Sequence, residues 1–134
     1  MNVMKMKKLL IISDDDSGVG VMAGLFLNDF SRDLEVVTAG IVASSAYHVL
    51  LQPLMRECMI DVSGMTPRLY KTNLGDFDII VDMCQKESLP PDITALAVFD
   101  FGVFPEDIAE GRLYRDTVKD AMFVFYRDVL RGML

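Results

Sequence analysis

Short apolar runs alternate with amphipathic stretches along the chain. Four apolar runs have the length of β-strands: residues 8–12, 34–38, 77–83 and 93–99. The first ends in Leu9-Leu10-Ile11-Ile12, as expected of a strand that is buried on both faces. Three other stretches carry apolar side chains at three- and four-residue steps, which is typical of helices that bury one face: residues 18–30, 44–59 and 111–134. Pro53 is expected either to kink the second helix or to mark its true start.

Strands that alternate with helices predict a parallel sheet covered by helices. We expect a single α/β domain over residues 1–134, because the chain shows no internal repeat, low-complexity tract or linker. In such folds ligands bind at the carboxyl ends of the strands. The segment after the first strand is therefore the first place to look for function.

The composition excludes several classes of function. The 134 residues include 13 Lys and Arg against 20 Asp and Glu, a formal net charge of −7, and 51 % of them are hydrophobic. Such a chain is too apolar to be disordered and too acidic to bind nucleic acid, which needs clustered Lys and Arg. Its apolar runs are far shorter than the about 20 residues of a membrane-spanning helix, and the run after Lys8 is too short for a secretion signal. We expect a cytoplasmic protein with neither a nucleic-acid nor a membrane partner.

The segment after the first strand is acidic and reads Ser13-Asp14-Asp15-Asp16-Ser17-Gly18-Val19-Gly20. A strand, a loop and a helix N-terminus in this order commonly hold a phosphate. Three neighbouring carboxylates oppose an anion here, because each would repel a unit negative charge ~4 Å away by roughly 4 kcal/mol at an effective dielectric constant of 20. The helix N-terminus offers only about half a positive charge in compensation. Electrostatics therefore disfavours an anion site.

Three interpretations of this acidic segment remain open. In the first, Asp14, Asp15 and Asp16 hold a divalent cation such as Mg²⁺, since hard cations bind clustered carboxylates. In the second, they form an acidic surface for a basic partner. In the third, they are solvated side chains, with Asp16 or Ser17 as the N-cap of the following helix. Gly18-Val19-Gly20 lacks the third glycine of a dinucleotide fingerprint, so no organic cofactor is expected.

Several segments, taken in order, resemble the low-molecular-weight protein tyrosine phosphatases and the thioredoxin-coupled arsenate reductases that share their fold. The family pattern is a hydrophobic strand, a Cys-x5-Arg-Ser phosphate loop, a helix with Met-Ala near its start, Ser-Ala-Gly-Thr, Ile-Asp-Ile-Ser-Gly and a Phe-Asp strand. The matching residues here are Leu9-Leu10-Ile11-Ile12, Met22-Ala23, Thr38-Ala39-Gly40-Ile41, Ile60-Asp61-Val62-Ser63-Gly64 and Phe77-Asp78-Ile79-Ile80-Val81. The resemblance covers nearly the whole chain. The expected fold is a three-layer α/β fold with a four-stranded parallel sheet, order 2-1-3-4, and helices on both faces.

The chain departs from this family at each residue that the resemblance would make catalytic. Ser13 stands at the position of the nucleophilic cysteine, and Val19 at that of the arginine that clamps the oxyanion. Phe104, followed by Pro105, stands where the family has its general acid, an Asp beside a Pro. A hydroxyl needs an adjacent base to act as a nucleophile, and three carboxylates oppose formation of an alkoxide. These departures predict the fold without the activity.

The cysteines do not restore reductase chemistry. Cys84 stands at the first resolving position of the reductase branch, but Leu89 stands at the second, so the relay of thiols is incomplete. Cys58 and Cys84 form no CxxC motif, and we expect both to be packed thiols. His48, the only histidine, is expected to be structural.

The sequence as a whole predicts a pseudoenzyme, a phosphatase-like and arsenate-reductase-like domain that acts as a binding or regulatory module. No catalytic residue is assigned, and residues 13–20 form a degenerate ligand loop. The expected partner is an unidentified protein at the acidic segment, or a second copy of the chain at Phe123 and Val124 on the last helix. The alternatives are a metal-dependent enzyme that uses Asp14, Asp15 and Asp16, and a residual phosphatase-type hydrolase.

Overall fold

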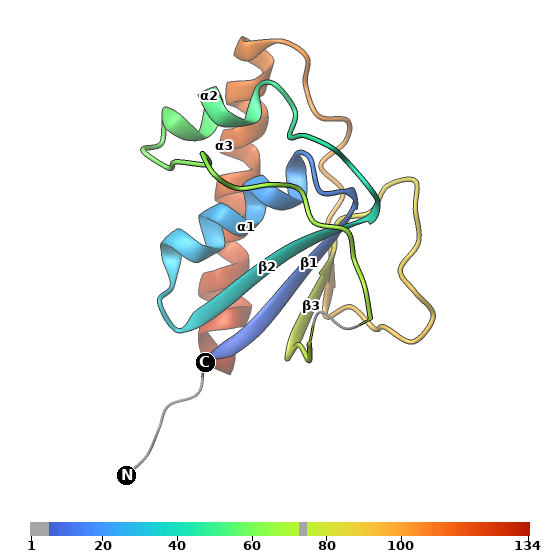
Figure 1. Ribbon diagram of the computed structural model, residues 1–134. Helices are drawn as coiled ribbons and strands as arrows, with labels where there is room; N and C mark the ends of the chain where they lie inside the picture. The colour runs from blue at the N-terminus through green and yellow to red at the C-terminus, as the bar shows by residue number, and fades with distance from the viewer. Residues whose placement is uncertain (1–5, 73–74) are drawn as a thin grey trace.

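Strands and helices alternate along the chain as far as β3, β4 follows β3 directly, and the strands form a parallel sheet against which the helices pack (Figure 1). The computed structural model describes residues 6–72 and 75–134. Its elements are β1 (Lys7–Asp15), α1 (Val19–Phe30), β2 (Leu34–Val42), α2 (Leu51–Arg56), β3 (Ile79–Asp82), β4 (Ala97–Val98) and α3 (Ile108–Phe125), which continues as the π-helical turn η1 (Tyr126–Leu130) and the 3₁₀ turn η2 (Arg131–Met133). Within the described residues the strand order is β2-β1-β3-β4 and every pair is parallel, which confirms the predicted class and order.

The central strand β1 is buried on both faces, as its apolar run predicts. Leu9 and Ile11 belong to one buried cluster, Leu10 and Ile12 to the other, and none of the four is exposed. The three α-helices all contribute buried side chains to the cluster of Leu9 and Ile11. The opposite cluster packs against other strand residues and against the segments that connect the strands. In the described part of the chain, helices therefore cover one face of the sheet and connecting segments the other. Helices were expected on both faces, but the buried side chains of α2 pack in the same cluster as those of α1 and α3.

Several boundaries differ from the predicted ones. β2 extends to Val42, because its last residues remain paired with β1 as far as Asp15. The second helix covers only Leu51–Arg56 instead of residues 44–59, so that Pro53 lies in its first turn, where a missing N–H leaves no helical hydrogen bond unmade. β3 and β4 are shorter than the apolar runs at 77–83 and 93–99.

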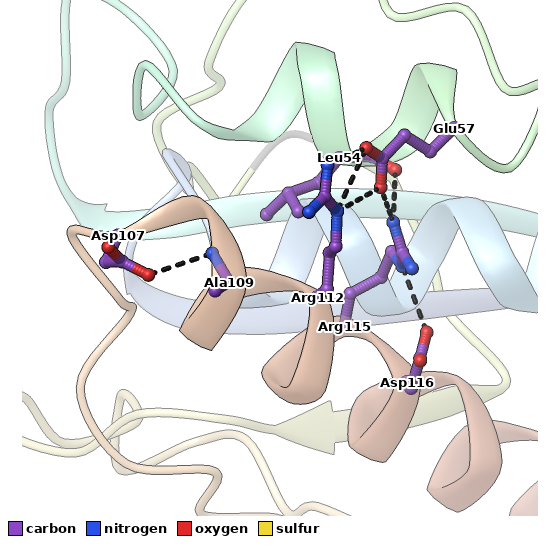
Figure 2. A network of polar contacts seen from close by, with 7 residues as sticks. All are labelled: Leu54, Glu57, Asp107, Ala109, Arg112, Arg115 and Asp116. Atoms are coloured by element: carbon purple, nitrogen blue, oxygen red, sulfur yellow. Dashed lines mark hydrogen bonds and ion pairs between the residues drawn. The ribbon is translucent and has the colours of Figure 1, made fainter.

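The last helix begins three residues earlier than predicted, at Ile108 instead of residue 111. Asp107 explains this start, because its carboxylate caps the helix: it accepts hydrogen bonds from the N–H groups of Ala109 (2.8 Å, Figure 2) and Glu110 (3.1 Å). Every helix in the described residues is too short or too polar to span a membrane.

An ion-pair network fastens the short α2 to α3 (Figure 2). The carboxylate of Glu57, the residue after α2, accepts hydrogen bonds from the guanidinium groups of Arg112 (2.8 Å) and Arg115 (2.6 Å) on α3. Arg115 also donates to the carbonyl oxygen of Leu54 (3.2 Å) and to the carboxylate of Asp116 (3.0 Å). These bonds hold the end of α2 against the long helix.

The network predicts an acid-sensitive contribution to stability. Hydrogen bonds from Arg112 and then Arg115 lower the pKa of Glu57 from 4.5 to about 2. Since the folded-state pKa is the lower one, this contribution is present above about pH 4.5 and is lost as the pH falls through about 2. We expect Glu57→Gln to lower the Tm at pH 7 and the difference from the wild type to shrink towards pH 2. Thermal unfolding followed by circular dichroism checks this, with Asp120→Asn, an exposed position on α3 outside the network, as the control. A Tm difference that does not depend on pH would contradict it.

Candidate functional site

The segment after the apolar part of β1 is partly strand, partly turn and partly helix. β1 stays paired with β2 through Ser13 and Asp15, whose partners are Gly40 and Val42. Residues 16–18 alone connect the strand to α1, which begins at Val19. Gly18 is the N-cap residue of α1 and no side chain caps it, so the predicted capping by Asp16 or Ser17 is wrong.

Ser13 is enclosed by the turn and the first turn of α1. Its side chain is 4 % exposed, and its hydroxyl donates a hydrogen bond to the carbonyl oxygen of Asp15 (2.9 Å). A Cβ on Gly20 would lie 2.6 Å from the Ser13 hydroxyl oxygen, so only a glycine lets α1 approach this closely. The hydroxyl thus bonds to a backbone carbonyl instead of to a group that could take its proton.

Asp14 bridges β1 to the segment that follows β3. Its carboxylate accepts hydrogen bonds from the backbone N–H groups of Gln85 (3.0 Å), Lys86 (3.0 Å) and Glu87 (2.8 Å). Three successive N–H groups that converge in this way form an anion-binding concavity. Here the protein fills that concavity with its own carboxylate.

Asp15 and Asp16 have different surroundings, although they are adjacent in sequence. Asp15 accepts a hydrogen bond from the hydroxyl of Ser17 and is half-buried at the surface of the turn. Asp16 is 2 % exposed, and its Oδ2 accepts a hydrogen bond from the N–H of Arg68 (2.8 Å). Burial raises the pKa of Asp16, although the N–H of Arg68, the Thr38 side chain and the charge of Arg68 act in the opposite direction.

The structure therefore does not bring the three carboxylates together as the metal interpretation expects. Asp14 bonds to residues 85–87, Asp15 to Ser17, and Asp16 to Arg68. Among the described residues, no group of three or more His, Cys, Asp and Glu side chains is arranged to hold a metal ion.

A cavity of about 270 Å³ opens at this end of the sheet. Its walls come from the acidic segment, from the residues that follow β3, and from the segment that leads into α3. The lining residues are Ser13, Asp14, Asp15, Ser17, Gly18, Val19, Met83, Gln85, Lys86, Gly102, Val103, Phe104 and Tyr114. Of the predicted residues 13–20, six line this cavity, while Asp16 and Gly20 do not.

Of the remaining lining residues, the sequence connects Phe104 with the site, through the position of the family's general acid, but it does not predict the others. The rings of Phe104 and Tyr114 meet edge to face, with centroids 5.2 Å apart, and Gln85 and Lys86 also line the cavity. The signal that points to Gln85 and Lys86 is their place directly after the predicted third strand, because parallel strands end at one edge of the sheet. Tyr114 lies on the amphipathic stripe of α3, so its spacing in the sequence indicates core packing and gives no sign that it lines the cavity.

His48 contacts the wall residue Phe104 but does not itself line the cavity. Its backbone N–H donates to the carbonyl oxygen of Ser17 (2.8 Å), and its Nδ1 accepts from the N–H of Leu50 (3.1 Å). Its ring packs against Phe104, with centroids 4.6 Å apart, and its Nε2 lies 3.6 Å from the carboxylate of Glu106. These contacts fit the structural role that the sequence predicts for this residue.

Cys84 lies beside the cavity wall in surroundings that suppress its reactivity. Its thiol donates to the carbonyl oxygen of Ile12 (3.8 Å). Burial, followed by the charge of Asp82, raises the pKa of Cys84 from 9.0 to about 12. A redox-active cysteine needs the opposite, a lowered pKa that yields thiolate at neutral pH.

We predict that iodoacetamide alkylates Cys84 far more slowly in the folded protein than in the unfolded protein at pH 8. A pKa three units higher reduces the thiolate fraction roughly 1000-fold at this pH. Mass spectrometry of timed digests measures the rate at each cysteine. Equal rates for Cys84 in the folded and unfolded chains would contradict the prediction.

Comparisons with known proteins agree on the fold. No protein-family model matches the chain, and no curated protein does. An arsenate reductase from Archaeoglobus fulgidus is 21 % identical, covers 85 % of this chain over 94 % of its own, and has a TM-score of 0.68. An arsenate reductase in an oxidized state is 25 % identical, with coverages of 87 % and 94 % and a TM-score of 0.70. A low-molecular-weight protein tyrosine phosphatase from T. tengcongensis is 16 % identical, with coverages of 92 % and 99 % and a TM-score of 0.75. The chain therefore has the fold of the arsenate reductase and low-molecular-weight protein tyrosine phosphatase superfamily, as its ordered motifs predict.

Proposed function

We propose that the chain is a catalytically inactive member of this superfamily that acts as a binding or regulatory module. In this proposal, the acidic end of the sheet recognises a positively charged segment of a partner protein. The observation that carries the proposal is the lining of the 270 Å³ cavity, in which the carboxylates of Asp14 and Asp15 stand against one basic side chain, that of Lys86, beside the apolar side chain of Val19.

The arrangement of groups in the cavity does not support phosphatase chemistry. Ser13 is buried and bonds to a carbonyl oxygen, so no adjacent base activates it as a nucleophile. Phe104 presents an aromatic ring to the cavity, which offers no proton to a leaving group. Transfer of a phosphoryl group requires positive charge around the transferred oxygens, and the carboxylates of Asp14 and Asp15 oppose it.

The same arrangement favours a cationic side chain. A Lys or Arg residue that enters the cavity meets Asp15 at its charged end and the rings of Phe104 and Tyr114 along its stem. Val103, which is 81 % exposed at the rim, offers an apolar contact to neighbouring residues of the partner. The metal site and the dimer interface, which the sequence offered as alternatives, have less support. The three aspartates bond to separate partners, and the exposed Phe123 of the predicted dimer face packs edge to face on Phe30 of its own chain.

The inactivity is tested by hydrolysis of p-nitrophenyl phosphate. We expect the purified wild-type chain and Ser13→Ala to release p-nitrophenol at the same background rate, because the serine hydroxyl takes no part in any reaction. Hydrolysis by the wild type well above that of Ser13→Ala would refute the proposed inactivity.

The binding mode is tested with short peptides. We expect an oligo-lysine peptide to shift the backbone amide signals of residues 13–19 and 102–104 at low salt, and an oligo-glutamate peptide to leave them unchanged. Asp15→Asn should weaken the binding, whereas Asp120→Asn removes the same charge on the exposed side of α3 and should not. Equal binding by both variants would show that the peptide responds only to the net charge of −7.

A further inference from the structure

A second and larger cavity lies on the other side of the acidic segment. Its volume is about 690 Å³, and it is bounded by α1, by the middle of β2 and by residues 59–68. In Figure 1 this light-green segment leaves α2 and runs across α1 towards the carboxyl end of β2. The two cavities share no lining residue.

Asp16 is the buried polar group of this cavity. Its side chain is 2 % exposed and lines the cavity, and its Oδ2 accepts the N–H of Arg68 (2.8 Å). Its Oδ1 is buried and accepts no hydrogen bond among the described residues, although the Thr38 side chain, which also lines the cavity, lies close enough to lower the pKa of Asp16. A buried acceptor without a donor is unfavourable, and more so when it is charged. Asp16 Oδ1 can therefore accept a hydrogen bond from a donor in the open space next to it, which is the cavity.

The charges around the cavity favour a hydrogen-bond donor that is positively charged. Three carboxylates line it, those of Asp16, Asp29 and Asp61, against the single guanidinium group of Arg68. Asp61 keeps its charge, because hydrogen bonds from the N–H and hydroxyl of Ser63 lower its pKa. The cavity therefore attracts cations and repels anions.

The volume of the cavity and the apolar side chains in its lining favour an organic ligand. Cavities that bind small organic molecules usually measure about 300–1,000 Å³, a range that includes this one. Met59 is 95 % exposed and Met65 is 42 % exposed, and both line the cavity with flexible apolar side chains that adapt to a ligand. The half-buried ring of Tyr47 also lines it, and an aromatic face attracts a cationic group.

We propose that this cavity binds a small organic cation. Its ammonium or amidinium group donates to Asp16 Oδ1, and its apolar body lies against Met59 and Met65. The proposal is independent of the function proposed above, because the residues involved belong to the other cavity.

The test uses four ligands of one shape and different charge on the ¹⁵N-labelled full chain at constant ionic strength. Benzylamine and benzamidine carry the cationic group, benzyl alcohol is the neutral counterpart and benzoate the anionic one. We expect saturable shifts of the amide signals of Gly24, Thr38 and Arg68 with the two cations. Benzyl alcohol should bind about tenfold more weakly or worse, since its hydroxyl can donate to Asp16 but carries no positive charge, and benzoate should not bind.

Asp16→Asn supplies the matched variant. Asn keeps an oxygen for the N–H of Arg68 but presents an N–H₂ group to the cavity, and it removes a buried charge, so we expect it to fold. Binding of benzylamine should fall at least about tenfold in Asp16→Asn and stay unchanged in Asp120→Asn. Should Asp16→Asn fail to fold, the comparison of the four ligands on the wild type decides alone.

The proposal is overturned if benzyl alcohol binds as well as benzylamine, or if Asp16→Asn binds benzylamine as well as the wild type. It is also overturned if sodium or potassium chloride alone produces the same shifts, because the site would then take a simple inorganic cation. Shifts confined to Gln85, Gly102 and Val103 would place the amine in the smaller cavity and would overturn it as well.

Discussion

Gly40→Ala is expected to destabilise the protein by about 3 kcal/mol and to displace the acidic segment. A Cβ at position 40 would lie 2.5 Å from the Cα of Asp15 and 2.5 Å from the backbone nitrogen of Asp16. Backbone atoms cannot turn aside as the end of a flexible side chain can. Gly40 is also held on its other side, because its N–H donates to the carbonyl oxygen of Arg68 (2.8 Å) and its carbonyl oxygen accepts from the N–H of Tyr70 (2.8 Å). Relief of the clash therefore requires movement of β1 or loss of these bonds.

Urea unfolding monitored by circular dichroism measures this effect, which is a large fraction of the about 5–15 kcal/mol that a typical domain has. Gly132→Ala is the matched control, because a Cβ there meets no atom within 4 Å, and its stability should stay close to that of the wild type. A Gly40→Ala protein as stable as Gly132→Ala would show that position 40 of β2 is not in close contact with the backbone of Asp15 and Asp16.

The second large effect is expected at Asp14, where Asp14→Ala should cost about 2 kcal/mol and loosen the segment after β3. Its carboxylate accepts from three backbone N–H groups, those of Gln85, Lys86 and Glu87, at 2.8–3.0 Å. Hydrogen bonds to a charged acceptor contribute about 1.5–3 kcal/mol each when shielded, and the partial exposure of these bonds reduces their sum.

Hydrogen exchange locates this effect. The amides of residues 85–87 should exchange at least about tenfold faster in Asp14→Ala, because a lost acceptor leaves them open to water. Asp14→Asn keeps one acceptor oxygen and should lie between Asp14→Ala and the wild type. Unchanged exchange at residues 85–87 in Asp14→Ala would mean that Asp14 does not hold this segment in solution.

The strands and helices were predictable because their main determinants are local, whereas the strand order was expected from the family resemblance. The uninterrupted apolar run Leu9-Leu10-Ile11-Ile12 predicts a strand buried on both faces, and that strand lies in the middle of the sheet. The limits of the second helix were harder to predict. The apolar stripe of residues 44–59 favours a long helix, but Pro53 permits one only when it lies in the first turn.

The detailed structure of the acidic segment was not predictable, since it depends on distant partners. Asp14 bonds to residues more than 70 positions later in the chain, and Asp16 bonds to Arg68, 52 positions later. Three adjacent aspartates look alike in the sequence, so nothing local indicates that one bridges two segments, one stays at the surface and one is buried. That the segment opposes an anion depends on charge alone and stays a prediction.

The most direct test of the central claim, that this end of the sheet is no oxyanion site, is a titration of the ¹⁵N-labelled chain with inorganic phosphate and arsenate. We expect no saturable shift of the amide signals of residues 13–20, because the carboxylates of Asp14 and Asp15 outnumber the one basic side chain in the lining, that of Lys86, and Val19 supplies no positive charge. Saturable binding of either ion, with its shifts centred on residues 13–20, would contradict the account.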